Sequence, residues 1–294
     1  MREGSDKLRK GICLTALYPQ AMVQVQLLVE LFYKVKNTGI FNCVEFYFQG
    51  EEEDEVKIGQ VLHELGLSSV FLAGYFMKKE KIDISAQEEE KRRSSVEKCK
   101  ELYSHACRMK TDKMLILSGP AWEKKNRKFI ISQTRKSLLE LGEQQILNGP
   151  EITLEYFNTW GEPWLAVGDV AMVKEIFEGK PDLKVGITFD TSHTAQMNAD
   201  IKKAFVDLLP WVRHIHLANS VSTDKGSPLF GDKHPLFSIE HGDFTLKSIK
   251  NFYKDLKKTG VLKRIDICSF EVISRGQEDR FFEELCKEAK FVWE

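Results

Sequence analysis

Short apolar runs alternate with longer amphipathic segments along most of the chain. The apolar runs are rich in Val, Ile, Leu and Phe and carry few polar positions. Such nearly continuous apolar runs are typical of parallel strands that are covered on both faces. They predict strands at residues 11–14, 43–48, 69–73, 114–117, 152–157, 185–189, 214–217 and 265–271.

The segments between these runs carry apolar residues at helical spacing. In the first of them, Val23, Leu27, Leu31 and Val35 fall on one face of a helix. A capping-box pattern, Ser-Ala-Gln-Glu at residues 85–88, predicts that another helix begins at Ser85. Together the patterns predict helices at residues 20–36, 55–65, 85–109, 127–147, 170–177, 199–208, 246–258 and 277–290.

The alternation gives eight strand–helix units of about 37 residues each, a size that suits a compact βα unit. A chain of 294 residues fits either two ordinary domains or one large barrel. Eight consecutive βα units favour the barrel, so we expect one α/β domain, a (β/α)₈ TIM barrel over residues 1–294. An open doubly wound sheet is the alternative, but no glycine-rich phosphate-binding motif follows an early strand.

Composition narrows the setting in which the protein acts. The hydrophobic fraction of 42% excludes a disordered chain, and the net charge of −1 gives no overall attraction to nucleic acid or to an anionic membrane. The polar N-terminus lacks the apolar region of a secretory signal, and no apolar run is long enough to span a membrane. Six scattered cysteines without a C-x-x-C pair indicate reduced thiols, so we expect a cytoplasmic protein.

Polar residues end four consecutive predicted strands, from the fifth to the eighth. They are Glu155, Asp190, His216 and Glu271. In a parallel barrel these strand ends meet at one mouth, where active sites are built. Three carboxylates buried close together would be costly without a cation. Oxygen ligands with one imidazole suit a single divalent metal ion, Mn²⁺, Mg²⁺, Co²⁺ or Zn²⁺.

The same residues carry a resemblance to a known superfamily. The stretches F-D-T-S-H at residues 189–193 and H-I-H-L at residues 214–217, with Glu155 and Glu271, resemble the metal site of the xylose isomerase-like barrels. The resemblance implies a sugar, sugar-acid or keto-acid isomerase or epimerase. Glu155 and Glu271 would move the proton through an enediolate, and Asp190 and His216 would complete the metal shell.

Further residues that follow the strands are candidates for binding the substrate. The resemblance implies contacts to the sugar from a histidine, an asparagine and a glutamate, while tryptophans at this mouth favour ring stacking and a lysine offers a cation. These candidates are His193, Asn158, Glu162, Trp122, Trp160 and Lys225. Glu45 and Tyr18 are further candidates for the pocket wall.

An alternative hypothesis, a nuclease, rests on the long segment at residues 219–244, which has no regular pattern of apolar and polar residues. Its Asp232 and His234 resemble, with His193, the ligands of a second zinc ion in zinc-dependent AP endonucleases. Those enzymes also use histidines at the ends of strands three and four, and this sequence has none at residues 71–75 or 115–120. Asp232 and His234 would then bind a second metal or order the loop over the pocket.

The alternatives at this point differ in the partner they imply. The isomerase reading implies a small-molecule carbohydrate and disfavours nucleic acid and membranes, since the charge is balanced. The AP endonuclease-like hypothesis implies a phosphodiesterase. A third hypothesis is a catalytically degenerate barrel that binds a sugar. Many members of the superfamily form dimers or tetramers, so the resemblance is compatible with a homo-oligomer.

Overall fold

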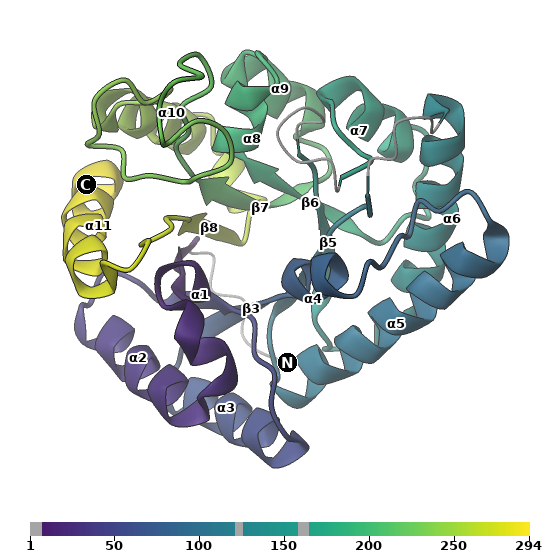
Figure 1. Ribbon diagram of the computed structural model, residues 1–294, viewed down its shortest axis with the longest axis horizontal. Coiled ribbons are helices and arrows are strands. Elements are labelled where there is room, and N and C mark those ends of the chain that lie inside the picture. Colours follow the sequence, from purple (N-terminus) through teal and green to yellow (C-terminus); the bar gives the residue numbers. More distant parts are fainter. Residues whose placement is uncertain (1–7, 121–125, 158–164) are drawn as a thin grey trace.

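Eight parallel strands close into a barrel in the computed structural model, which describes residues 8–120, 126–157 and 165–294. Each strand pairs with the next in the sequence, and the first pairs with the last, which confirms the predicted (β/α)₈ TIM barrel (Figure 1). The strands are β1 Arg9–Cys13, β2 Cys43–Phe46, β3 Ser68–Leu72, β4 Lys113–Ile116, β5 Glu151–Glu155, β6 Gly186–Asp190, β7 Val212–Leu217 and β8 Ile267–Phe270.

Helices form a ring around the barrel and bury their apolar faces against it (Figure 1). On the β6 side, for example, Phe189 packs edge-to-face on Phe205 of one helix and lies near Phe252 of another. The larger helices are α2 Val25–Asn37, α3 Glu52–Leu65, α5 Glu89–Arg108, α6 Arg127–Gln144, α7 Val170–Phe177, α9 Ile201–Leu208, α10 Leu246–Lys258 and α11 Glu278–Trp293. Shorter elements are α1 Leu14–Leu17, η1 Pro19–Val23, α4 Gly74–Lys79, α8 Thr191–Gln196 and η2 Val261–Lys263.

The capping box predicted at Ser85 is wrong. Helix α5 begins at Glu89, and Glu88 occupies the N-cap position without a side-chain cap. Ser85 is buried, and its backbone N–H and its hydroxyl both donate to Asp83 Oδ1, at 3.1 and 2.7 Å. The serine therefore stabilises a buried turn before the helix, because its short side chain reaches the nearby carboxylate instead of a helix terminus.

The first predicted helix is also divided. Pro19–Val23 forms a 3₁₀ turn, and α2 begins only at Val25 because Gln24 has an extended backbone between them. Two short helices, α4 and α8, follow β3 and β6 directly and were not expected from apolar periodicity. Both lie on the side of the barrel where the strands end, so they help to enclose the mouth (Figure 1).

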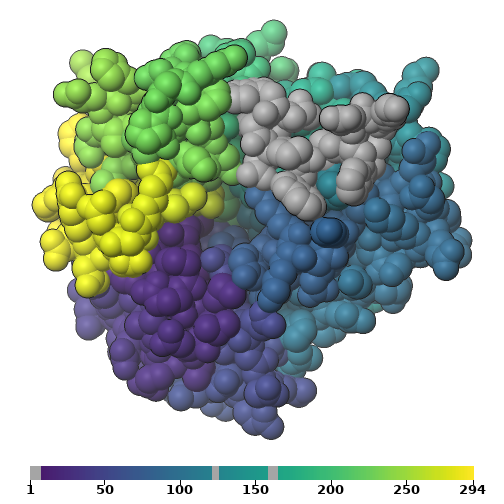
Figure 2. Space-filling view, in the orientation of Figure 1, coloured from purple at the N-terminus to yellow at the C-terminus, as the bar shows by residue number. Residues whose placement is uncertain are grey.

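The long segment between β7 and α10 is an ordered loop that folds back on its own base. Asn219 Oδ1 accepts hydrogen bonds from the N–H groups of Ser220 and Phe244, which ties the two ends of the loop together. Gly242 passes so close to Asn219 that a Cβ there would lie 2.6 Å from Asn219 Nδ2, so this position needs glycine. The loop packs against the chain segment that follows β8, where green and yellow meet in Figure 2.

None of the helices within the described ranges is long and apolar enough to cross a membrane.

Candidate metal centre

The four residues at the ends of β5 to β8 converge at the barrel mouth. Glu155 and Asp190 are the last residues of β5 and β6, His216 is the penultimate residue of β7, and Glu271 directly follows β8. Each offers one side-chain ligand atom, and these four atoms all lie within 4.8 Å of one another. The structure thus brings the four sequence-derived candidates into one cluster.

The cluster is centred on one nitrogen of His216. Its Nδ1 lies 3.1 Å from Glu155 Oε1, 3.0 Å from Glu271 Oε2 and 3.8 Å from Asp190 Oδ2. Asp190 Oδ2 and Glu271 Oε2 are buried, and neither accepts a hydrogen bond from any described residue. Buried carboxylate oxygens without a donor are costly unless a cation satisfies them. The three carboxylates and the imidazole therefore fit a divalent ion such as Mn²⁺, Mg²⁺, Co²⁺ or Zn²⁺.

Asp190 has a different task for each of its two oxygens. Oδ1 accepts the backbone N–H of His193 at 2.8 Å and so caps the N-terminus of α8. Oδ2 faces His216 in the cluster. The hydrogen bond that caps α8 holds the Asp190 carboxylate in one orientation, so it also fixes the direction in which Oδ2 points.

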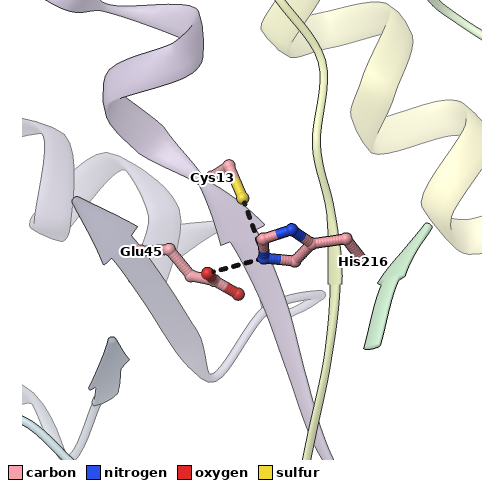
Figure 3. Close-up of side chains that lie close together, drawn as sticks. All are labelled: Cys13, Glu45 and His216. Atoms are coloured by element: carbon pink, nitrogen blue, oxygen red, sulfur yellow. Dashed lines mark hydrogen bonds and ion pairs between the residues drawn. The ribbon is translucent and has the colours of Figure 1, made fainter. Parts of the chain in front are cut away.

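Glu45 of β2 orients the imidazole of His216 from behind. Its Oε2 lies 3.0 Å from His216 Nε2 (Figure 3). Its Oε1 lies 2.8 Å from His214 Nε2. A carboxylate that holds the far nitrogen of a metal-binding histidine fixes the ring and its tautomer. Since Nε2 of His216 contacts Glu45, the other ring nitrogen, Nδ1, faces Glu155 and Glu271 in the cluster. Glu45, expected in the pocket wall, is fully buried behind the histidine instead.

The surroundings of Glu45 keep it ionised and leave the neighbouring thiol protonated. Burial acts to raise the pKa of Glu45, but His214 and His216 outweigh it and hold that pKa well below its ordinary value. Burial, with the charge of Glu45, raises the pKa of Cys13, whose sulfur lies 3.8 Å from His216 Nε2 (Figure 3). Cys13 is therefore a neutral thiol beside the imidazole.

The two glutamates of the cluster have pKa values displaced in opposite directions. Burial raises the pKa of Glu155, and the neighbouring His216 only partly offsets this. Burial also acts to raise the pKa of Glu271, but His234 and His216 outweigh it and hold that pKa well below its usual range. The two carboxylates therefore have different environments although both lie close to His216 Nδ1.

A second group of side chains lies beside the first. His193 Nε2 and His234 Nε2 lie 3.2 and 2.6 Å from the same oxygen, Asp232 Oδ1. His193 Nδ1 faces Asp190 and Glu155, each at 3.7 Å, and His234 Nδ1 lies 3.4 Å from Glu271 Oε2. The long loop thus brings Asp232 and His234 against His193, and Asp190, His193 and His234 offer a second set of metal-ligand atoms.

The remaining substrate-binding candidates are placed differently. Lys225 lies on an exposed turn in the long loop, in which Gly226 N–H donates to Asp224 Oδ1 at 2.9 Å. The Tyr18 hydroxyl donates to Asp279 at 2.9 Å and accepts from Lys34, so it joins α11 to α2. Four candidates lie outside the described residues, and their roles stay predictions: Trp122, Asn158, Trp160 and Glu162.

We expect Glu45→Gln to weaken metal binding by about 10- to 100-fold, the usual cost of losing the partner of a metal-binding histidine. The glutamine amide keeps the volume of Glu45, but its NH₂ group would face the Nε2 atom of either His214 or His216, where a carboxylate oxygen lay before. Titration with Co²⁺, followed by absorbance, measures the Kd. The matched control is Glu55→Gln, because Glu55 is equally buried but pairs with His105 and Arg108 between α3 and α5. The control should lower stability and leave the Kd unchanged; equal Kd values for wild type and Glu45→Gln would contradict the orienting role.

Comparison with solved structures gives the same fold. A D-tagatose 3-epimerase-like protein matches with a TM-score of 0.70 and 16% identity, covering 97% of this chain and 98% of that one. The IOLI protein with a bound zinc atom matches with a TM-score of 0.69 and 14% identity, covering 97% and 96%. An AP endonuclease of family 2 from Brucella melitensis matches with a TM-score of 0.65 and 18% identity, covering 96% and 99%. At these identities the likeness establishes the fold alone.

A search of curated proteins found no match. The family model described as xylose isomerase-like TIM barrel matches residues 32–285, a span that begins in α2, ends in α11 and includes the four residues of the cluster. This chain therefore belongs to the xylose isomerase-like TIM barrel family.

Proposed function

We propose that this protein is a divalent-metal-dependent isomerase or epimerase of a sugar, sugar acid or keto acid, and that Glu155 and Glu271 move the proton. One observation carries the proposal. Two glutamates, Glu155 and Glu271, lie within 3.1 Å of the same nitrogen, His216 Nδ1. Epimerisation at a carbon next to a carbonyl can use such a pair, one group to remove the proton and one to return it.

The roles of the residues follow from their positions. Glu155 and Glu271 lie 3.1 and 3.0 Å from His216 Nδ1, and we propose that either one removes a proton from the substrate while the other returns it. Asp190 and His216 would hold the metal together with the two glutamates. A bound divalent cation would supply polarisation of the substrate carbonyl. His193 Nδ1 lies 3.7 Å from Glu155 and from Asp190, and we propose that His193 contacts a substrate oxygen.

Similarity to epimerases supports the substrate class. Solved neighbours with this fold include an L-ribulose 3-epimerase and a 3-keto-D-glucoside 4-epimerase, each covering 97% of this chain. A small carbohydrate is accordingly the partner we propose. The protein has a net charge of −1, and nothing in that balance favours a polyanion as substrate.

The direct test is proton exchange in D₂O. Purified protein with added Mn²⁺ is incubated with a panel of ketoses and hydroxy-keto acids, and deuterium incorporation and new epimers are followed by NMR. We expect deuterium at the carbon next to the carbonyl of the true substrate. Metal binding and sugar binding without deuterium incorporation by any member of the panel would favour the degenerate sugar-binding barrel.

A zinc-dependent phosphodiesterase of the AP endonuclease type is the second candidate, and the second group of ligands favours it. His193, Asp232 and His234 lie together beside the first cluster. The histidines that would complete a third metal site are lacking. The chain has seven histidines, and those outside the two clusters are His214 behind His216, His63 on α3, His105 on α5 and His241 on the exposed loop.

Cleavage of an abasic-site oligonucleotide separates the two candidates. The isomerase proposal expects no cleavage above a no-protein control, with either Zn²⁺ or Mn²⁺ present. Cleavage by the wild-type protein that His234→Ala abolishes would replace the proposal with the phosphodiesterase. Metal analysis of the same sample gives the number of ions bound per chain, and more than one ion would show that the second group of ligands is used.

A further inference from the structure

Glu288 of α11 is a buried carboxylate that holds the long loop by its backbone. Only 4% of the residue is exposed. Its Oε2 accepts the N–H of Phe237 at 3.0 Å, and its Oε1 accepts the N–H of Ser238 at 2.8 Å. No cationic side chain among the described residues pairs with it. Two consecutive backbone donors offset part of the cost of burying this carboxylate, although burial still raises the pKa of Glu288. The loop is thus fixed to an outer helix at this point.

Three residues before Phe237, the same segment carries His234 into the site. His234 is 3% exposed and has a φ of 38°, in the left-handed region that non-glycine residues rarely adopt. Its carbonyl accepts the N–H of Ile273 at 3.0 Å, and its ring lies between Asp232 and Glu271. A backbone conformation of this kind persists only when its surroundings hold it in place.

The short connection links these two features mechanically. Three residues span at most about 10 Å, so Phe237 and His234 are not free to move independently. Between them, Leu236 O accepts from Asn219 Nδ2 at 3.2 Å, and the ring of Phe237 packs edge-to-face on Phe270 of β8 at 5.8 Å. The loop and α11 are in contact on the same side of the molecule, where green and yellow meet in Figure 2.

We infer that Glu288 is a positioning residue, which holds the imidazole of His234 against Asp232 and Glu271 through the two hydrogen bonds to Phe237 and Ser238. Glu288 itself does not touch the site: it acts through the backbone. The role of this position in turnover rests on the proposed function, whereas the placement of His234 does not.

Glutamine at position 288 is the informative change. Glu288→Gln keeps the volume and one acceptor, but its amide donor then faces a backbone donor, so one hydrogen bond to a charged group is lost and one N–H is left unsatisfied. Glu284→Gln is the matched control, because Glu284 lies one helical turn earlier on α11, is 42% exposed and pairs only with Lys287 among the described residues.

Exchange of the imidazole C2–H with D₂O, measured by mass spectrometry on individual histidines, reports how well each ring is shielded. Glu288→Gln should make His234 exchange about tenfold faster, the factor expected from losing one such hydrogen bond. His241, exposed in the same loop, sets the fast limit, and His214, buried in the barrel, sets the slow one. His214 should keep its slow rate in both variants, and Glu284→Gln should match wild type throughout.

Unchanged exchange at His234 in Glu288→Gln would overturn the inference. So would a rise at His214 as large as that at His234, since this would indicate general destabilisation. If Glu288→Gln fails to fold, Glu288→Asp is measured instead: it retains the charge but is one methylene shorter, and the same two outcomes apply.

Turnover distinguishes this inference from the proposed function. On an identified substrate, Glu288→Gln should lower kcat/KM by no more than His234→Ala does, and the double variant should be no slower than His234→Ala alone. Additive losses would show that Glu288 acts by another route and would contradict the positioning role. If no sugar is turned over but His234 exchange still rises in Glu288→Gln, the proposed function fails and the positioning of His234 stands.

Discussion

Glu271→Gln is expected to lower the rate of epimer interconversion by about 10²- to 10⁴-fold, the usual contribution of a positioned acid or base. Glutamine keeps an oxygen ligand at this position but removes the ionised group that takes the proton. Glu155 remains in the cluster, 3.1 Å from His216 Nδ1. We therefore expect one epimer to keep exchanging a proton with solvent while interconversion is lost. Deuterium NMR on each epimer separately, at saturating Mn²⁺, measures both.

Glu155→Gln should give the mirror result, with exchange preserved only for the other epimer. Glu240→Gln is the control, since Glu240 is exposed on the long loop and makes no ion pair within the described ranges. Wild-type interconversion in Glu271→Gln would show that the two-glutamate mechanism is wrong.

Asp190→Asn is expected to remove metal binding while leaving the fold intact. The asparagine oxygen can still accept the N–H of His193, so the cap of α8 is kept. Its amide donor replaces Oδ2, the buried oxygen that faces His216 without a hydrogen-bond donor among the described residues. A donor there repels a cation. Elemental analysis should find no stoichiometric metal, the melting temperature of metal-free protein should stay close to that of metal-free wild type, and proton exchange should stop.

Asp200→Asn provides the matched control for this change. Asp200 caps α9 in the same manner, with Oδ1 accepting from Lys203 N at 2.7 Å, but it lies on the surface. It should leave both metal content and turnover at the wild-type level. Full metal content in Asp190→Asn would exclude this carboxylate as a ligand.

The fold and the cluster of Glu155, Asp190, His216 and Glu271 can be predicted from the sequence for the same reason. Buried parallel strands leave nearly continuous apolar runs, and a polar residue at the end of such a run is conspicuous. Glu155 and Asp190 end their strands, and in a parallel barrel all such ends meet at one mouth. The order of the chain therefore places these side chains together without further information.

The residues that support the cluster are not accessible in this way. Glu45 meets His216 across the barrel interior, from β2 to β7, and no local pattern in either strand indicates that contact. Glu288 belongs to the buried residues of α11, but by its charge alone a glutamate in an amphipathic helix is expected on the surface. Ser85 shows the opposite error, because a local motif matched a helix start while a neighbouring carboxylate competed for the hydroxyl.

Closure of the barrel by β1 and β8 determines when the site can form during synthesis. The pairing joins Arg9–Ile12 to Ile267–Phe270, so the first and last strands of the barrel lie side by side. Glu271 follows the last strand, and the segment that holds His234 is completed by Ile273 and by α11. A ribosome that has released only the first seven strands presents three of the four ligands and an open sheet edge. A divalent metal ion held by all four side chains would therefore bind late, after β8 has paired with β1 through the long-range contacts that such topologies form slowly.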